Sequence, residues 1–400
     1  MNSDNTTWRF KAIDTWFFRE SRPHDSAGGS QLGSHFPPPA RTLAGAIRTL
    51  IGEINGVDWE DFNSNEHNPV RPLIGHSDTF GPLSFQGPWL FHDEKQRLYP
   101  VPAFLLEKEQ DGEKHYLHLD IGDPVHCDLG HVRLPALKPE HAGARPLQDQ
   151  WLTAQGLRDA LCGRAPAPSE VIDASQLFHS EPRLGIARDN NTRTALDSLL
   201  YQTTHIRPKP ALSVEMDVTG MTDKQPEKNK KYLLRLGGEG RMAEAQVLQQ
   251  NTQNPHPDIH LFRQRRLILV LLTPAYLNNP QGLPDDAATP AMSAQGDACW
   301  KLNINDVALT IHSAVLGKTQ REGGWNMARH KPRPVRSLIP AGSAWYCSLD
   351  DGMEIEEAIT RLLNAQIGEQ GERCLGRGQL TVGLWPEPLT TENKPTRSTT

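Results

Sequence analysis

Two segments, one in each half of the chain, carry apolar residues at the spacing of an amphipathic helix. The first stripe follows Arg41 and consists of Leu43, Ala46, Ile47, Leu50, Ile51 and Ile54. The second consists of Ile355, Ala358, Ile359, Leu362 and Leu363. Gly56 is a plausible stop for the first helix. Because such a helix buries only one face, each stripe needs a sheet or another helix to cover it.

Apolar and β-branched segments, separated by glycine and proline, predict strands around these two helices. They cover residues 8–18, 82–91, 211–218, 231–238, 265–272, 342–349 and 379–385. The run Leu267–Leu272 is too short to cross a bilayer and is typical of a buried strand. A further helix is expected near Leu152–Leu161. Strands with one strong helix in each half predict an α+β fold built from two related units.

A chain of 400 residues is long for one core and comfortable for two domains. The prolines at 208 and 210 place the expected boundary, which gives domains of residues 1–208 and 209–386. Insertions are expected around 107–146 in the first domain and around 278–297 in the second. The polar residues 387–400 are predicted to be a disordered tail.

Composition excludes several classes of protein. No segment is apolar enough to span a membrane, and the first ten residues lack the basic and apolar regions of a signal peptide. The five cysteines form no Cys-x-x-Cys pair, so neither a disulfide framework nor a zinc ribbon is indicated. We therefore expect a cytoplasmic protein without a cofactor.

The net charge of -6 argues against a protein that coats nucleic acid with its whole surface. Any basic site must be local. Candidate runs are Ala328–Arg336, Arg263–Arg266 and Lys228–Lys231. Each run taken alone is equally compatible with a solvated face.

The stretch CLGRGQLTVGLW, Cys374–Trp385, places Gly376 and Gly378 on either side of Arg377 just before a predicted strand. Glycine lets the main chain approach a partner closely, and turn N–H groups can bind phosphate oxygens. An arginine fork can pair with phosphate or stack on an unpaired base. The alternative is a tight turn whose arginine points to solvent.

Several ordered motifs together resemble one known family. They are residues 14–50, 181–209, 236–247, 324–346 and 374–385. Over residues 14–385 the chain is similar to the third subunit of the Cmr complex, the type III-B CRISPR effector. The segments 107–146 and 278–297 depart from that family's pattern.

The resemblance implies a RAMP-superfamily protein with two ferredoxin-like (RRM-like) domains and a C-terminal glycine-rich loop. It implies a non-catalytic structural subunit that caps the 5′ repeat-derived tag of the guide RNA. The implied partners are the guide RNA, the large polymerase-like subunit and neighbouring RAMP backbone subunits. A basic cleft shared with those subunits would reconcile RNA binding with the negative net charge.

The candidate RNA-binding residues lie in glycine-rich or turn-prone segments and beside the first helix. They are Arg19, Arg22, Arg41, Arg48, Arg183, Arg188, Arg193, Arg241, Gly376, Arg377 and Gly378. Arginines flanking the first strand and helix could instead form surface ion pairs.

Two enzymatic alternatives stay open. RAMP relatives cleave precursor RNA with a histidine base, for which His24 and His35 are the candidates here. A metal-dependent hydrolase could use His118, His126, Cys127 and His131 near Asp120 and Asp128, although their spacing matches no zinc pattern. No catalytic or metal residue is assigned.

Overall fold

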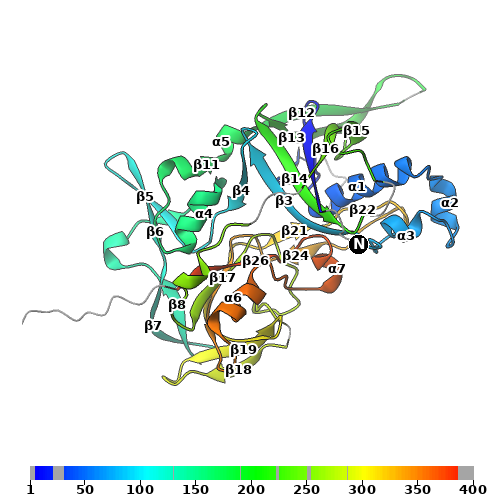
Figure 1. The fold of residues 1–400 in the computed structure, drawn as a ribbon. Helices are drawn as coiled ribbons and strands as arrows, with labels where there is room; N and C mark the ends of the chain where they lie inside the picture. Colours follow the sequence, from blue (N-terminus) through cyan, green and yellow to red (C-terminus); the bar gives the residue numbers. More distant parts are fainter. Residues whose placement is uncertain are drawn as a thin grey trace, which may run out of the picture.

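The structure, a computed structural model, describes residues 5–20, 31–128, 130–189, 191–221, 225–249, 254–285 and 287–385. It is a mixed α/β fold of mostly antiparallel strands with few helices (Figure 1). Among the described residues, no helix combines the length and apolarity that crossing a membrane requires. The predicted tail and Arg22 lie outside the described residues.

The first sheet has eight strands in the order β11-β10-β4-β3-β14-β1-β16-β15. Their bounds are β1 (Thr6–Ala12), β3 (Ser84–His92), β4 (Gln96–Pro100), β10 (Gln150–Leu152), β11 (Val171–Asp173), β14 (Leu212–Thr219), β15 (Lys231–Arg235) and β16 (Met242–Gln249). β1 is antiparallel to both β14 and β16, and β14 is antiparallel to β3. Counted along the chain, these four strands lie in the order fourth, first, third, second.

The second sheet has six strands in the order β18-β19-β20-β25-β17-β26. Their bounds are β17 (Arg266–Leu271), β18 (Thr289–Met292), β19 (Ala298–Ile304), β20 (Val307–Val315), β25 (Ala344–Leu349) and β26 (Leu380–Leu384). The strands β17, β20, β25 and β26 pair antiparallel in the same fourth, first, third, second order. The two halves are therefore related in topology.

One helix covers each sheet, as the two stripes predict. α1 (Ala40–Ile54) follows β1 and buries Leu43, Ile47 and Leu50 in a cluster with Trp8 and Phe10. α6 (Ile355–Leu362) lies between β25 and β26 and buries Ala358, Ile359 and Leu362. The predicted first helix is confirmed, and the second ends before Leu363.

The remaining helices are short. They are α2 (Trp59–Ser64), α3 (Arg71–Ile74), α4 (Ala154–Leu161), α5 (Ala174–Leu177) and α7 (Gln370–Arg373), with 3-10 turns η1 (Pro139–His141), η2 (Pro168–Glu170) and η3 (Ile259–Leu261). α4 is the helix predicted near Leu152–Leu161.

The strand β17 explains the most apolar run of the sequence. Leu267, Leu269 and Leu271 face the cluster beneath α6. Ile268 and Val270 face a third cluster, which also contains Trp89 of β3 and Leu157 and Leu161 of α4, so the two sheets share a core. Because both faces of β17 are covered, polar residues do not alternate with apolar ones along it.

Smaller sheets fill the connections. They comprise β2 (Gln31–Leu32) with β12 (Phe178–Arg188) and β13 (Ala195–Pro208); β5 (Leu105–Gln110) with β6 (Glu113–His118) and β9 (Arg145–Pro146); β7 (Asp120–Cys127) with β8 (Gly130–Ala136); β21 (Gln320–Glu322) with β24 (Arg336–Leu338); and β22 (Trp325–Asn326) with β23 (Lys331–Pro332). β12 and β13 form a long hairpin that extends beyond the first sheet (Figure 1).

The two segments expected as insertions meet in space. β8 packs beside β19 and β20, and Arg133 Nε lies 2.6 Å from Asp297 Oδ2. Their status as insertions stays a prediction.

The first strand is shorter than expected, and the division into domains near residue 208 stays a prediction. The first strand ends at Ala12 rather than running to Phe18, because the chain bends at exposed Ile13 and Asp14 before Trp16 pairs with Ile206. The sheets change between Gln249 and Arg266, since β14, β15 and β16 all pair in the sheet of β1. The prolines near residue 208 form a turn between β13 and β14.

Candidate nucleic-acid interface

Four segments that are far apart in the sequence line one groove beside the N-terminus of α1. They are residues 17–20, His35 with the start of α1, the pair Gly237–Gly238, and residues 321–327. The groove encloses about 510 Å³. Each segment belongs to, or directly adjoins, one of the motifs that carried the family resemblance.

Glycine fixes one wall of the groove. Gly237 has a φ of +92°, and a Cβ there would lie 2.6 Å from the carbonyl oxygen of Phe17. The N–H of Gly238 donates to that same oxygen at 2.8 Å. A side chain at Gly237 would therefore push the loop after β15 away from the segment after β1.

The segment after β21 presents apolar side chains to solvent. Trp325 is 55% exposed and Met327 is 73% exposed, on the short hairpin of β22 and β23. Gly323 and Gly324 precede this hairpin and also line the groove. An exposed indole next to open space can stack on an unpaired base.

The groove contains cations of two kinds. Arg19 and Arg321 are exposed, whereas Arg41 is mostly buried and its Nη2 lies 2.6 Å from Glu372 Oε1. Glu20 and Glu322 also line the groove. The exposed arginines can reach a phosphate, while Arg41 is already held by a carboxylate.

Behind the groove lies an arginine cluster, defined here as Arg41, Arg48, Arg333, Arg336 and Arg377. Arg333 pairs with Asp78, and Arg336 contacts Glu369 at 2.6 Å and Glu372 at 3.4 Å. Arg48 lies over the ring of Phe80 at 5.2 Å. The carboxylates of the C-terminal half thus hold arginines from both halves.

Arg48 is the least compensated member of the cluster. Its Nε is buried and has no hydrogen-bond partner among the described residues. Burial, together with the charges of Arg333 and Arg41, lowers the pKa of Arg48 to about 10. The acid that counters this effect, Asp78, already pairs with Arg333. An external anion would therefore find an under-neutralised guanidinium here.

The glycine-rich loop is buried rather than open. Arg377 is 4% exposed, pairs with Glu322 and lies 2.8 Å, Nε to Oε2, from Glu372. The N–H groups of Gly376 and Gly378 donate to the carbonyls of Arg373 and Pro274. These groups are already engaged inside the protein, so RNA contact by residues 376–378 stays a prediction.

The two glycines of this loop allow close backbone packing. Gly376 has a φ of +81°, and a Cβ there would lie 2.8 Å from Gln86 Cα of β3. Gly378 has a φ of +69°, and its Cβ would lie 2.0 Å from the carbonyl oxygen of Ile367. The loop therefore joins the second sheet to the first.

A second basic cluster surrounds Asp14. Arg183 and Arg241 place guanidinium nitrogens 3.0 Å and 3.4 Å from Asp14 Oδ2, and Arg207, which the sequence did not single out, also contacts this carboxylate. The hydrogen bond from Arg183 holds the pKa of Asp14 below its ordinary value. The structure thus brings Arg183 and Arg241 together on Asp14, whereas Arg377 is held by Glu322 and Glu372.

The remaining candidates are dispersed. Arg193 is exposed at the turn between β12 and β13 with a φ of 60°, and Arg188 ends β12. The roles of these arginines in RNA binding stay predictions.

The histidines considered for catalysis or metal binding are separated. His35 lines the groove, whereas His24 lies outside the described residues. The rings of His126 and His131 face each other across the β7–β8 hairpin, with centroids 5.0 Å apart. In the described part of the chain, no three His, Cys, Asp or Glu side chains gather as a metal site would require.

Sequence reasoning missed Trp325, Arg321 and the carboxylates that hold the cluster, and it reached Arg333 only as part of the basic run Ala328–Arg336. Trp325 and Arg333 lie within the quoted motif 324–346, but that motif drew attention through its basic run. The signal available was a glycine pair followed by tryptophan, a pattern that suits an exposed hairpin tip.

The sequence matches the family model described as CRISPR-associated protein (Cas_Cmr3) over residues 8–385. Two solved cryo-EM structures are similar in shape. A chain of type III-B Cmr-beta bound to cognate target RNA and AMPPnP, state 1, is 16% identical with a TM-score of 0.46, over 85% of this chain and 86% of that one. A chain of type III-B Cmr-beta bound to cognate target RNA is 14% identical with a TM-score of 0.47, over the same shares.

No curated protein matches the chain significantly. The assignment therefore depends on the family match, which covers nearly all the residues between the first strand and the last. The family predicted from the ordered motifs is confirmed, and the chain belongs to the Cmr3 family of CRISPR-associated proteins.

Proposed function

We propose that this chain is a non-catalytic, RNA-binding structural subunit of a type III-B CRISPR effector complex. The groove beside α1 holds the guide RNA at its 5′ repeat-derived tag. One observation carries this proposal: four distant segments converge on a groove lined by two exposed arginines, Arg19 and Arg321, and by an exposed tryptophan, Trp325. Cations for the backbone and an aromatic platform for bases are what single-stranded RNA needs.

The arginine cluster extends this groove along α1. Arg41 and Arg48 lie two helical turns apart on one side of the helix, and the Nε of Arg48 has no hydrogen-bond partner among the described residues. A strand leaving the groove past Arg48 would bring a phosphate to a guanidinium whose countering acid, Asp78, already pairs with Arg333. This local excess of positive charge is compatible with a net charge of -6.

The strand order supports the RAMP-type, ferredoxin-like assignment of both halves. Ferredoxin-like units place their four strands in the order fourth, first, third, second, and both sheets contain that order. Each unit keeps one of the two usual helices: α1 follows the first strand of one unit, and α6 precedes the last strand of the other.

The proposed protein partners are the large polymerase-like subunit and neighbouring RAMP backbone subunits. Exposed apolar side chains on the β12–β13 hairpin, Leu184 at 73% and Ile186 at 57%, are suited to contacts within an assembly. The relatives solved as Cmr-beta bound to target RNA agree with a place in such an assembly.

Two enzymatic readings remain as outcomes of a test. His35 lines the groove, and its Nδ1 is 3.0 Å from the carbonyl oxygen of Pro37. Cleavage that a chelator does not affect and that disappears in His35→Ala would favour the endoribonuclease. Cleavage that a chelator abolishes would favour the metal-dependent hydrolase.

Groove variants test the proposal directly. Labelled guide RNA is titrated against the full chain and against Arg19→Glu, Arg48→Met and Trp325→Ala across a salt series, with Lys301→Glu as control. Lys301 is exposed on β19, in the other sheet. We expect Trp325→Ala to cost about 1–3 kcal/mol of binding, as loss of one stacked base does. Arg48→Met should lower the salt slope by about 0.7, the value for one phosphate of a single strand.

Thermal melting checks that each variant is folded. Groove variants that bind guide RNA as the control does, at every salt concentration, would remove the groove from the RNA site. Cleavage by the isolated chain would overturn the non-catalytic assignment.

A further inference from the structure

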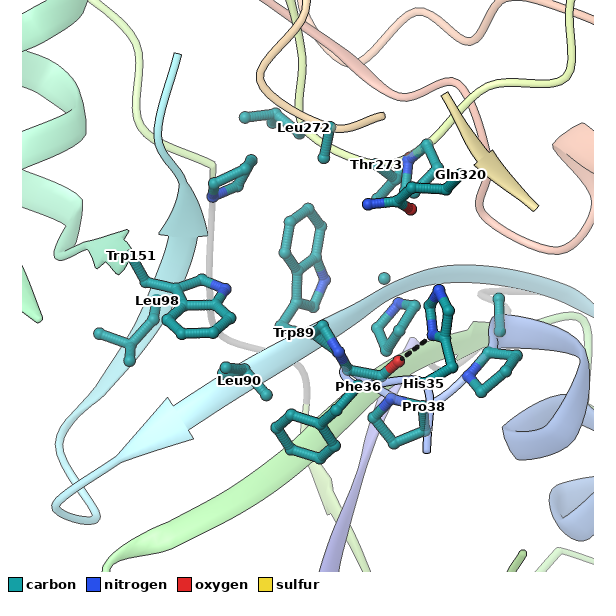
Figure 2. A pocket seen from close by; sticks show the side chains of 18 of the residues that line it. His35, Phe36, Pro38, Trp89, Leu90, Leu98, Trp151, Leu272, Thr273 and Gln320 are labelled. Carbon is teal, nitrogen blue, oxygen red and sulfur yellow. Dashed lines mark hydrogen bonds between the residues drawn. The ribbon is translucent and has the colours of Figure 1, made fainter. Parts of the chain in front are cut away.

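A second pocket of about 370 Å³ lies between the two sheets and borders the groove. Its floor is β3, its sides are Phe36 with three consecutive prolines and Trp151, and Leu272 with Thr273 closes it from the second sheet. Figure 2 shows Trp89 standing in this interdomain pocket, between Trp151 and His35. His35, Pro39 and Glu322 line both hollows, so the pocket opens beside the groove.

Trp89 brings an unused hydrogen-bond donor to the pocket. The residue is 2% exposed, and its Nε1 is buried with no acceptor among the described residues. A buried indole N–H normally finds a partner. Gln150, which also lines the pocket, has the opposite deficit, because its Oε1 is buried without a donor in the described part of the chain.

His35 supplies an acceptor at the border with the groove. Its Nδ1 lies 3.0 Å from the carbonyl oxygen of Pro37, and a carbonyl only accepts, so Nδ1 carries the hydrogen. In the neutral ring Nε2 is then an acceptor. Figure 2 shows the ring with Nδ1 bonded to this carbonyl and its other nitrogen turned toward the open part of the pocket, on the side of Gln320.

The charges of the lining argue against a phosphate inside the pocket. Asp149 and Glu322 line it, and the nearby cation, Arg377, is held by Glu322 and Glu372. What remains is a space bordered by aromatic and proline surfaces, with a donor and an acceptor at its edges. A planar, uncharged ring with both acceptors and donors on its rim matches this lining.

We propose that the interdomain pocket receives one unpaired nucleobase of the bound RNA, with Trp89 Nε1 and His35 Nε2 contacting its edge. This inference depends on the proposed function, because the RNA backbone would lie in the groove while one base turns past His35 and Pro39. A free nucleotide offers the same ring chemistry, so the test separates the two sources.

The experiment scans guide RNA with single abasic nucleotides, one position at a time, against the full chain. One position should be sensitive, weakening binding by about tenfold, as loss of a stacked and hydrogen-bonded base does. Trp89→Phe keeps an aromatic ring and removes the donor, and His35→Phe keeps a ring and removes the acceptor. Each should weaken binding of intact RNA and have no further effect when that sensitive nucleotide is already abasic.

Controls keep the proposal falsifiable. If Trp89→Phe melts at a lower temperature than the parent, the comparison of His35→Phe on intact and abasic RNA decides the test. His35 is only partly buried, so its substitution should disturb the fold less. Trp325→Ala should weaken intact RNA and the abasic RNA equally, because it acts in the groove. Each of the four nucleoside 5′-monophosphates is titrated separately with the parent and with both pocket variants.

The outcomes separate this inference from the proposed function. If no abasic position weakens binding while Trp325→Ala still does, the base-pocket proposal is wrong and the groove remains the RNA site. If a mononucleotide binds the parent but not His35→Phe, and no abasic position in the RNA weakens binding, the occupant of the pocket is a free nucleotide and not an RNA base. Absence of RNA binding overturns both.

Discussion

Arg377 shows how its neighbours decide the role of a single residue. A guanidinium between two glycines is typical of a phosphate contact, yet here Glu322 and Glu372 hold it at 4% exposure. Glu372 also contacts Arg41 and Arg336, so one carboxylate links three arginines. Removing one member of such a buried group leaves uncompensated charge. The arginine therefore positions Glu322 between the groove and the interdomain pocket.

Gly378→Ala should destabilise the protein by about 2–5 kcal/mol, because left-handed backbone costs about 1–2 kcal/mol and overpacking about 1–3 kcal/mol. The methyl group would lie 2.0 Å from the Ile367 carbonyl oxygen, at a φ of +69°. Urea unfolding measures the free-energy difference. Gly45→Ala in α1 is the matched control: no atom lies within 4 Å of its Cβ, and it should stabilise by about 0.5–1 kcal/mol. Equal stability of both variants would contradict this account of the loop.

The residue pattern of a strand reflects what covers its two faces. β17 is apolar throughout because α6 lies on one side and the cluster of α4 on the other. β14 alternates instead: Val214, Met216 and Val218 enter the core beneath α1, while Glu215 and Asp217 turn to the opposite face. There Arg97 binds both carboxylates, at 2.7 Å and 2.6 Å, within a buried network.

Ile359→Ala should lower the free energy of unfolding by about 2–5 kcal/mol, the usual range for deleting a large buried aliphatic side chain. Ile359 is fully buried where α6 packs on the second sheet. Its neighbour Thr360 is exposed, and Thr360→Ala should change stability by less than about 0.5 kcal/mol. Denaturant unfolding of the two variants makes the comparison. A small loss for Ile359→Ala would mean that α6 does not hold this core together.

At the scale of the whole molecule, three apolar clusters join the two sheets into one structure. The third lies between them and contains residues of β3, α4, β17 and β25. Residues of both halves line the groove and the interdomain pocket, and both halves contribute arginines to the cluster. Both hollows thus depend on how the halves are joined.

Stability should fall as the pH drops below about 6.5, the ordinary pKa of histidine. Burial is the main cause that lowers the pKa values of His118, His205 and His312. Below that pH the unfolded chain binds protons at these histidines, whereas the folded protein keeps them neutral. Their contribution to the free energy of unfolding is therefore complete above pH 6.5 and declines below it. Melting temperatures at pH 7.5 and 5.5 measure the loss. His118→Phe should show a smaller loss, and a profile independent of pH for the parent would contradict the argument.

Features that depend on local spacing were predicted well. The stripe of α1 and the apolar run of β17 are properties of a few consecutive residues, and burial of one or both faces follows directly from them. The order of motifs was enough to identify the family. The end of the first strand was missed, because nothing in the aromatic density of residues 8–18 marks the bend at Ile13.

The sequence by itself determined the helices α1, α4 and α6, strands such as β14 and β17, the family and the local character of any basic site. The tertiary structure decided which arginines are available. Arg377 and Arg19 look alike in the sequence, but one is neutralised by carboxylates 55 and 5 residues away in the chain, and the other is exposed. Those carboxylates come close only when β21 and α7 pack against the loop before β26. Charge compensation depends on distance in space, and only the folded chain fixes it.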